Sequence, residues 1–405
     1  MIFDKLDRIG GNRVVIALSA ARLGDAIGNS ILFIVLPIFV AKLPAPAVNL
    51  PETVRVGVLI ALYGLVNSIL QPFAGAFIDR VGRRKPFILG GLVLMAVATL
   101  GFVSVGRYTN LLLMRSLQGV GVALTIPAAL ALLASSSQRA TRGGSMGIYT
   151  TSRMIGLAAG PLVGGALYDR FGFNAAFFVG GGFIILAVLL VQLWVKEAAP
   201  VPAKGNPGRF RIIDPALLSA GILGVAFATF VMASGFTMMS ALENQFNERL
   251  NINAFLFGIA FSALLFSRIF TQVPLGRLSD RIGRKPVIIA GLVLMAPATA
   301  LLGYATSVTQ LTILRLIQGV GSGAVAAPAF AVAADLAQTG GEGRQMSIIT
   351  MGFGLGIALG PLLAGVLAVH SFTLPFLAGG VFCLLGAWAV QRYVPETVRP
   401  GETGG

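Results

Sequence analysis

Long apolar stretches follow one another along the chain, separated by short polar or basic segments. A helix needs about 20 largely apolar residues to cross the hydrocarbon core of a bilayer. Twelve segments have this length: 14–41, 55–79, 86–105, 108–134, 145–168, 173–196, 215–242, 254–278, 286–305, 309–336, 345–369 and 372–394. The pattern predicts an all-α membrane protein of twelve transmembrane helices, with both termini on the same side.

The composition favours membrane-spanning helices over a soluble fold. Hydrophobic residues make up 56% of the 405 residues and charged residues only 11%, whereas soluble proteins carry roughly 25% charged residues. The single Cys383 excludes an internal disulfide, and a single His370 leaves few of the usual ligands for a metal. We therefore expect no metal site and no cofactor, and the lipid bilayer as the partner of the apolar surface.

Lysine and arginine are distributed unequally between the two sides. Of the 30 basic residues, 20 fall on the side of the N-terminus, five on the opposite side and five within spans. Basic loops stay in the cytoplasm during insertion. Both termini are therefore predicted to be cytoplasmic, in a multi-pass protein of the cell membrane. This topology accounts for the net charge of +15, and no nucleic-acid partner is predicted.

Short sequence segments recur 200 residues further along the chain. Gly91–Thr99 returns as Gly291–Thr299 with one change in nine, and Gln118–Gly121 and Gly160-Pro161 also have copies at this spacing. Six spans separate the copies, so the two halves have the same orientation in the membrane. Parallel halves of this kind characterise one class of secondary transporter, with the substrate site at their interface.

The repeat predicts two similar domains. Residues 1–195 form an N-terminal six-helix bundle and residues 215–405 form a C-terminal one. The segment 196–214 between them is rich in proline, glycine and charge, which predicts a cytoplasmic linker.

A loop rich in glycine and arginine follows the second span and recurs after the eighth. The first copy occupies 75–86 and the second, one residue shorter, occupies 276–286. Both resemble the cytoplasmic signature loops of the major facilitator superfamily, and the resemblance extends over about residues 14–394. It implies a latch that holds the halves together when the cavity faces outward. Its residues would be Gly75, Asp79, Arg80, Gly82 and Arg83, with Gly276, Asp280, Arg281, Gly283 and Arg284. A basic loop that only sets topology is the alternative.

Two arginines lie in the middle of predicted spans. Arg115 and Gln118 in the fourth span have counterparts in Arg315 and Gln318 in the tenth. An arginine at the bilayer centre costs about 2.5–3.5 kcal/mol, so each must face a cavity or a polar partner. Arg115 resembles an arginine that the superfamily associates with proton coupling. A structural link between helices is the alternative for both arginines.

Asp25 is the acidic residue predicted to lie deepest within a span. Burial disfavours a charged carboxylate while a nearby arginine favours it, so Asp25 could bind and release a proton. By the resemblance, the first and fourth helices line the cavity, and Asp25 could meet Arg115 there. Arg22, one helical turn earlier, offers the alternative of a permanent ion pair without a coupling role.

Other polar residues within the spans are reserve candidates for the cavity. Glu243 and Asp335 could carry protons in place of Asp25. The arginines Arg153 and Arg268 could receive an anionic substrate group or pair with neighbouring side chains. The set is completed by Asn29, Gln118, Arg315 and Gln318.

The fifth span carries Gly156, Gly160, Pro161, Gly164 and Gly165. Glycines four residues apart lie along one helix face and allow a second backbone to approach, and a proline allows a bend. The segment resembles the motif of the superfamily's antiporters rather than of its uptake systems. Ordinary packing of glycines is the alternative.

These features predict a transporter rather than an enzyme. The resemblance implies a monomeric drug:proton antiporter that exports amphipathic or lipophilic molecules by alternating access, driven by a proton gradient and without a cofactor. A proton-coupled lipid or glycolipid flippase and a metabolite or sugar importer are alternatives, since Pro395-Glu396-Thr397 resembles the ending of sugar porters. A non-transporting membrane sensor is the alternative from another class. No catalytic or metal-binding residues are predicted.

Overall fold

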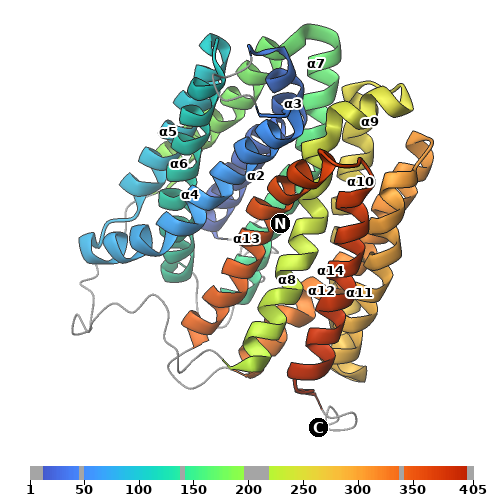
Figure 1. Ribbon diagram of the computed structural model, residues 1–405. Coiled ribbons are helices and arrows are strands. Elements are labelled where there is room, and N and C mark those ends of the chain that lie inside the picture. The colour runs from blue at the N-terminus through green and yellow to red at the C-terminus, as the bar shows by residue number, and fades with distance from the viewer. Residues whose placement is uncertain (1–11, 45–49, 137–141, 196–218, 337–341, 399–405) are drawn as a thin grey trace. The chain divides into compact units, whose positions relative to one another are not determined.

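A computed structural model describes residues 12–44, 50–136, 142–195, 219–336 and 342–398, and the regular elements in these ranges are all helices (Figure 1). Eleven of the described helical stretches are long and apolar enough to cross a membrane. The predicted all-α membrane fold is confirmed at this level. The predicted linker 196–214 lies outside the described residues.

The chain divides into two compact units, residues 1–49 with 65–210 and residues 50–64 with 211–405. The helices of the first unit are α2 (Arg13–Ser30), α3 (Leu32–Lys42), most of α4 (Glu52–Val81), α5 (Lys85–Gly101), α6 (Tyr108–Ser136) and α7 (Arg142–Trp194). The second unit contains α8 (Ala220–Thr237), the 3-10 helix η3 (Met238–Leu242), α9 (Glu243–Leu250), α10 (Ala254–Ile282), α11 (Arg284–Leu301), α12 (Val308–Asp335), α13 (Glu342–Ala368) and α14 (Leu374–Tyr393).

The first turns of α4 belong by contact to the second unit. The Thr53 hydroxyl donates a hydrogen bond to the carbonyl oxygen of Gly365 in α13 at 2.9 Å. A side chain at Gly57 would meet the Pro361 carbonyl oxygen at 2.7 Å, so the two backbones are in close contact there. Residues 50–64, which the sequence repeat counts with the first bundle, are thus grouped with the second unit.

Helix α7 covers two of the predicted spans. It runs for 53 residues, and Gly172 interrupts it with φ 78° and ψ −171°, a backbone conformation that is not helical. Only glycine adopts this region readily, so this residue joins two helical segments where the sequence predicts a loop between 145–168 and 173–196. The prediction of twelve separate spans stays a prediction.

Helices α2 and α8 are corresponding elements of the two units. Each has 18 residues and begins after a capping side chain, Asn12 for α2 and Ser219 for α8. Each also ends at a hydroxyl residue that bonds to a neighbouring backbone: Ser30 donates to Gly156 O at 3.0 Å, and Thr237 to Ile357 O at 3.3 Å. The caps Asn12 and Ser219 are 207 residues apart, and so are the last residues Ser30 and Thr237. This pair of helices therefore follows a slightly longer spacing than the 200 residues between the repeated sequence motifs.

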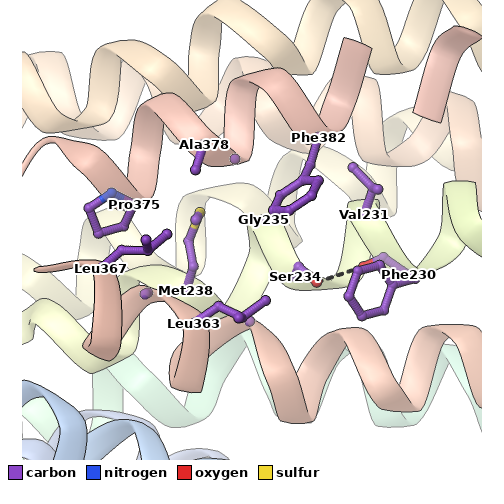
Figure 2. Close-up of a pocket in the computed structure, with 13 residues that line it drawn as sticks. Phe230, Val231, Ser234, Gly235, Met238, Leu363, Leu367, Pro375, Ala378 and Phe382 are labelled. Atoms are coloured by element: carbon purple, nitrogen blue, oxygen red, sulfur yellow. Dashed lines mark hydrogen bonds between the residues drawn. The ribbon is translucent and has the colours of Figure 1, made fainter. Parts of the chain in front are cut away.

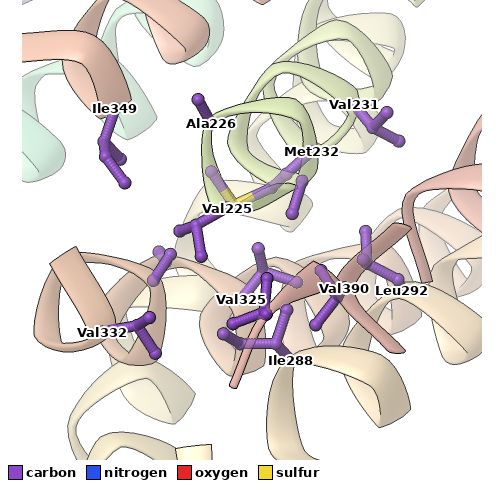
Figure 3. Close-up of a cluster of buried hydrophobic side chains, with 14 of the residues drawn as sticks. Val225, Ala226, Val231, Met232, Ile288, Leu292, Val325, Val332, Ile349 and Val390 are labelled. Carbon is purple, nitrogen blue, oxygen red and sulfur yellow. The ribbon is translucent and has the colours of Figure 1, made fainter. Parts of the chain in front are cut away.

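The core of the second unit is built around α8, which packs against its neighbours through buried aliphatic side chains (Figure 3). Val225 and Met232 of α8 lie among Leu292 of α11, Val325 of α12 and Val390 of α14. These five side chains are at most 2% exposed, as expected for close-packed helices.

Large apolar side chains also cover the outside of the units. Ile69 is 61% exposed, and Leu193 and Phe270 are each 74% exposed. In water such exposure would be unfavourable for each side chain, whereas lipid solvates these side chains directly. The exposed side chains therefore agree with the membrane location inferred from the sequence.

Candidate functional site

An ion pair is buried in the middle of α2. Arg22 Nη1 donates a hydrogen bond to Asp25 Oδ2, one helical turn further on. The side chains of Arg22 and Asp25 are only 7% and 2% exposed. The intrahelical pair that the sequence offered as an alternative is therefore present.

Residues of α7 complete the surroundings of this ion pair. The Arg22 guanidinium lies over the ring of Tyr149 at 5.9 Å from its centroid. Arg153, one turn beyond Tyr149 on α7, acts electrostatically on both Asp25 and Tyr149. A small pocket at this site is lined by Arg22, Asp25 and Tyr149 together with Leu18, Ala21, Ile88, Leu92, Thr125, Ala129 and Val191. The site thus places one carboxylate between two arginines and a tyrosine, in otherwise apolar surroundings.

The second oxygen of the Asp25 carboxylate distinguishes this pair from an ordinary salt bridge. Oδ1 is buried and has no hydrogen-bond partner among the described residues. Leaving a buried polar atom without a hydrogen-bond partner costs free energy. Most buried polar atoms are therefore paired, and an unpaired one calls for an explanation such as a functional role. Oδ1 is thus a position where a proton could bind without displacing the hydrogen bond from Arg22.

Tyr149 was not singled out in the sequence, although a signal for it exists. It lies seven residues before Gly156, two turns away on the same face of α7, and Gly156 packs against α2. A helical face that contacts α2 at one glycine also presents the residues one and two turns earlier to α2. This periodicity could have placed both Tyr149 and Arg153 beside Asp25.

Arg115 belongs to a separate hydrogen-bonded chain. Its Nη1 donates to Gln118 Oε1 at 2.9 Å, Gln118 Nε2 donates to Thr99 Oγ1 at 2.7 Å, and Thr99 donates to Met95 O at 2.7 Å. Asp25 is instead bonded to Arg22, and Arg153 acts on it electrostatically. The predicted meeting of Asp25 and Arg115 is therefore not among the described contacts.

The second unit repeats this chain but not the ion pair. Arg315 Nη1 donates to Gln318 Oε1 at 3.0 Å, and Gln318 Nε2 donates to Thr299 Oγ1 at 2.8 Å. At the spacing of 207 residues that relates α2 to α8, Met232 stands in place of Asp25 and Thr229 in place of Arg22. The acid of α2 thus has no counterpart at the matching position of α8, whereas the arginine–glutamine–threonine chain occurs in both units.

The glycines of the fifth predicted span lie against α2, as their spacing indicated. A Cβ at Gly156 would meet Leu23 O at 2.7 Å, and one at Gly160 would meet Ser30 Oγ at 1.8 Å. Further along α7, Gly164 approaches the backbone of Ile31, Pro161 lies within the helix, and Gly165 is buried. These contacts hold α2, and with it Asp25, directly against the α7 segment that carries Tyr149 and Arg153.

The two signature loops share a glycine with positive φ, at 71° for Gly82 and 106° for Gly283. The arginine two residues before the last residue of each loop, Arg84 or Arg284, bonds to the end of the helix two spans further along the chain. Arg84 donates to Ser135 Oγ at 2.7 Å, whereas Arg284 forms an ion pair with Asp335 and lies 3.6 Å from Asp280. Asp335, a reserve proton carrier, is therefore a partner of the loop. The side chain of Asp79 lies outside the described part of the chain, and Arg80, Arg83 and Arg281 are exposed.

Comparison with known proteins places this architecture in a family. The family model described as Major Facilitator Superfamily matches residues 18–247 and, a second time, residues 225–404. The protein belongs to the major facilitator superfamily. Its apolar helices agree with a multi-pass membrane protein, and the repeated match agrees with the internal repeat of the sequence.

The relatives of this superfamily member include transporters of different kinds. It is 29% identical to the human synaptic vesicular amine transporter over 326 residues, which is 79% of this chain but only 62% of that protein. It is 28% identical over 338 residues to the multidrug resistance protein MdtG of Enterobacter lignolyticus, covering 82% of this chain and 80% of that one. The multi-drug resistance efflux pump PmrA of Streptococcus pneumoniae is 25% identical over 347 residues, covering 84% and 86%.

Solved structures of the superfamily share the fold at low sequence identity. A bacterial homologue of the human lysosomal transporter Spinster, in an inward-facing and occupied conformation, aligns with a TM-score of 0.77 and 16% identity, covering 93% of this chain and 95% of that one. The human organic anion transporter MFSD10 aligns with a TM-score of 0.68 and 20% identity, covering 94% and 99%. These likenesses concern the fold alone.

Glu396 ties the second signature loop of this superfamily member to the segment after α14. Its carboxylate accepts hydrogen bonds from the backbone amides of Arg284 at 2.9 Å and Lys285 at 3.1 Å, at the beginning of α11. A Cβ at Gly283 would lie 2.6 Å from Glu396 Oε2, so the glycine provides both the positive φ and the space for this cap. A carboxylate is favourable at a helix N-terminus because the first amides have no intrahelical acceptor.

We expect the Glu396→Ala variant to lower the free energy of unfolding by about 1 kcal/mol, because the first amides of α11 lose their cap. Glu396→Gln keeps an acceptor oxygen without the charge and should fall between this variant and the wild type. Thermal unfolding in detergent measures the order. An unchanged melting temperature for Glu396→Ala would contradict the assigned role.

The remaining reserve residues are spread over other helices. Glu243 is fully buried at the start of α9, and Asn29 is half-buried near the end of α2. Arg268 is 7% exposed in α10, where its Nε donates to Gln272 Oε1 at 3.2 Å and its guanidinium lies 5.8 Å from the centre of the Phe353 ring. Within its own unit, the Arg268 guanidinium therefore already contacts Gln272 and Phe353.

A separate, narrow pocket lies between α8, α13 and α14 in the second unit (Figure 2). It is lined by Phe230, Val231, Ser234, Gly235, Met238, Gly360, Leu363, Ala364, Leu367, Pro375, Ala378, Gly379 and Phe382. The hydroxyl of Ser234 donates to the carbonyl oxygen of Phe230 at 2.9 Å, which leaves the pocket almost entirely apolar. No candidate residue predicted from the sequence is part of this lining.

Proposed function

We propose that this transporter is a proton-coupled antiporter of the cell membrane, which exports amphipathic or lipophilic small molecules by alternating access. The observation that carries the proposal is the Asp25 carboxylate, buried in the first unit with one oxygen bound to Arg22 and the other without a hydrogen-bond partner. We further propose the finer architecture expected from the sequence, with twelve spans, cytoplasmic termini and a monomer as the working form.

In this proposal Asp25 alternates between two forms. As a carboxylate it holds the ion pair with Arg22, and Arg153 adds a favourable positive charge. A proton on Oδ1 neutralises the carboxylate and weakens its attraction for Arg22 and Arg153. The two forms of the site therefore differ in the force that draws α2 and α7 together, which is the differential interaction that a conformational change requires.

The cargo class is inferred from relatives and from the character of the site. The names of MdtG and PmrA describe multidrug resistance and efflux, and the vesicular transporters carry amines. An amine carries a positive charge at neutral pH, and a buried carboxylate can attract such a charge when it is unprotonated. We therefore place lipophilic organic cations first, and neutral drugs and lipids after them.

A proteoliposome experiment tests this function. We expect wild-type protein in acid-inside liposomes to release protons when a lipophilic cation such as tetraphenylphosphonium is added, because cargo and protons exchange. A pH-sensitive dye inside the vesicles measures the release, and protein-free vesicles are the control for passive leakage. Release with lipid analogues or sugars instead would support the flippase or importer alternatives, and no exchange with any compound would contradict antiport.

The latch variant Asp79→Asn separates a carrier from a sensor. Loss of exchange with normal membrane insertion supports alternating access, because a sensor has no need of the latch. Binding of cargo to both the wild type and the Asp79→Asn variant, without exchange in either, would favour the sensor.

A further inference from the structure

The end of α8 lies within a predicted span, where the backbone has no water to bond with. The last four carbonyl groups of an α-helix lack an intrahelical donor, and in the hydrocarbon region such groups must find partners within the protein. Helix α8 ends at Thr237 and passes into the 3-10 helix η3, so these carbonyls belong to residues 234–237.

All four of these carbonyl groups have donors, and Arg315 supplies two of them. Ser234 O accepts the backbone amide of Met238, and Thr237 O accepts the Ser240 hydroxyl at 2.6 Å. The other two are bound by Arg315 of α12: Nη1 donates to Gly235 O at 3.2 Å, and Nη2 donates to Phe236 O at 3.1 Å. The guanidinium thus supplies donors to two successive carbonyl groups at this helix end.

Arginine suits this position for two reasons. Its guanidinium is planar and carries several donors in fixed directions, so that one group serves two successive carbonyls. Its positive charge also meets the negative end of the α8 dipole, which favours cations at a helix C-terminus. Arg315 is fully buried, and burial strengthens both interactions by lowering the local dielectric.

Contacts on the other sides hold the guanidinium in place. Nη2 also donates to Phe261 O of α10 at 3.4 Å, and Nη1 donates to Gln318 Oε1 at 3.0 Å. The group lies 5.1 Å from the centre of the Phe261 ring and 6.0 Å from that of Phe236, within the range of cation–π attraction. Gln318 is itself fixed by Thr299 of α11. Arg315 therefore links α8, α10, α11 and α12.

We propose that Arg315 is a positioning residue that fastens the end of α8 and fixes the point at which α8 changes to η3, and that it takes no part in proton transfer. The two arginines of the internal repeat would then have different tasks. At the spacing of 207 residues that relates α2 to α8, Met232 stands in place of Asp25, so α8 has no counterpart of the acid to which the proposed function assigns coupling. The arginine of the second unit is bound instead by the backbone of the helix that would have carried that acid.

Hydrogen exchange of the purified protein tests this inference without any transport assay, so its outcome is independent of the proposed function. In Arg315→Gln and Arg315→Lys we expect the amides of residues 238–242 to exchange about tenfold faster or more, because hydrogen bonds to a charged group are lost at the α8 end. Lysine should retain part of the protection, since one ammonium can still reach a carbonyl. Arg115→Lys, the matched change in the other copy, should leave these amides as they are in the wild type.

Two results would overturn the proposal. The first is that the amides of residues 238–242 exchange hydrogen in Arg315→Lys at the same rate as in the wild type. This conservative variant keeps the test usable if Arg315→Gln fails to fold. The second is a changed pH dependence of the residual transport in Arg315→Lys, which a proton-carrying group would produce and a positioning residue would not.

Discussion

The Asp25→Asn variant is expected to lose cargo-driven proton release completely. The amide has nearly the same shape as the carboxylate and can still accept a hydrogen bond from Arg22, but it cannot take up a proton. The change also removes the negative member of a pair that is at most 7% exposed. Breaking a buried ion pair on one side costs about 3–5 kcal/mol, so a fall in stability is expected together with the loss of coupling.

A double variant separates the two effects. Asp25→Asn with Arg22→Gln removes both charges, so we expect it to regain most of the melting temperature and still to release no protons. Asp25→Glu keeps an acid at the site and should retain exchange, with an altered pH dependence. The dye assay on proteoliposomes measures coupling, and thermal unfolding of the same preparations measures stability.

Proton release that survives in both neutral variants would show that Asp25 is not the carrier. Glu243, which is fully buried, would be the next candidate. Asp335 would be a weaker one, because it is paired with Arg284 and about a third of its side chain is exposed.

Substitution of Gly160 by valine is expected to give a large loss of stability in the first unit. Even a Cβ at this position would lie 1.8 Å from Ser30 Oγ and 2.9 Å from Ile27 O. Ser30 could rotate away, but it would lose its hydrogen bonds to Ala26 and Gly156, and the Ile27 backbone cannot move without displacing α2. Overpacking of this kind costs about 1–3 kcal/mol or more, and we expect little monodisperse protein.

Gly182→Val is the matched control because it lies on the same helix and a Cβ there would have nothing within 4 Å. It should have a melting temperature close to that of the wild type. Size-exclusion profiles and thermal unfolding of the two variants in one detergent make the comparison. Equal stability of the two variants would mean that α7 does not approach α2 at Gly160 as described.

Much of the fold could be predicted from the sequence because the signals are local. A run of about 20 apolar residues is enough to indicate a spanning helix. The orientation indicated by the excess of basic residues on one side stays a prediction. The ion pair of Arg22 and Asp25 follows from a spacing of three residues on one helix. The contact of Gly156, Gly160 and Gly164 with another helix likewise follows from their spacing, although the sequence did not say which helix they would meet.

Tertiary structure decided the contacts between residues far apart in the chain. Tyr149 and Arg153 lie beside Asp25, and Glu396 caps α11. Arg115 and Arg315 occupy matching places in the sequence, yet the binding of Arg315 to the end of α8 is visible only once the helices are packed. A spanning helix that is apolar all round has no single face that the hydropathy pattern marks as inward. Its rotation, and therefore the partners of its few polar side chains, is set by packing against neighbouring helices, which is why these contacts were beyond the reach of the sequence alone.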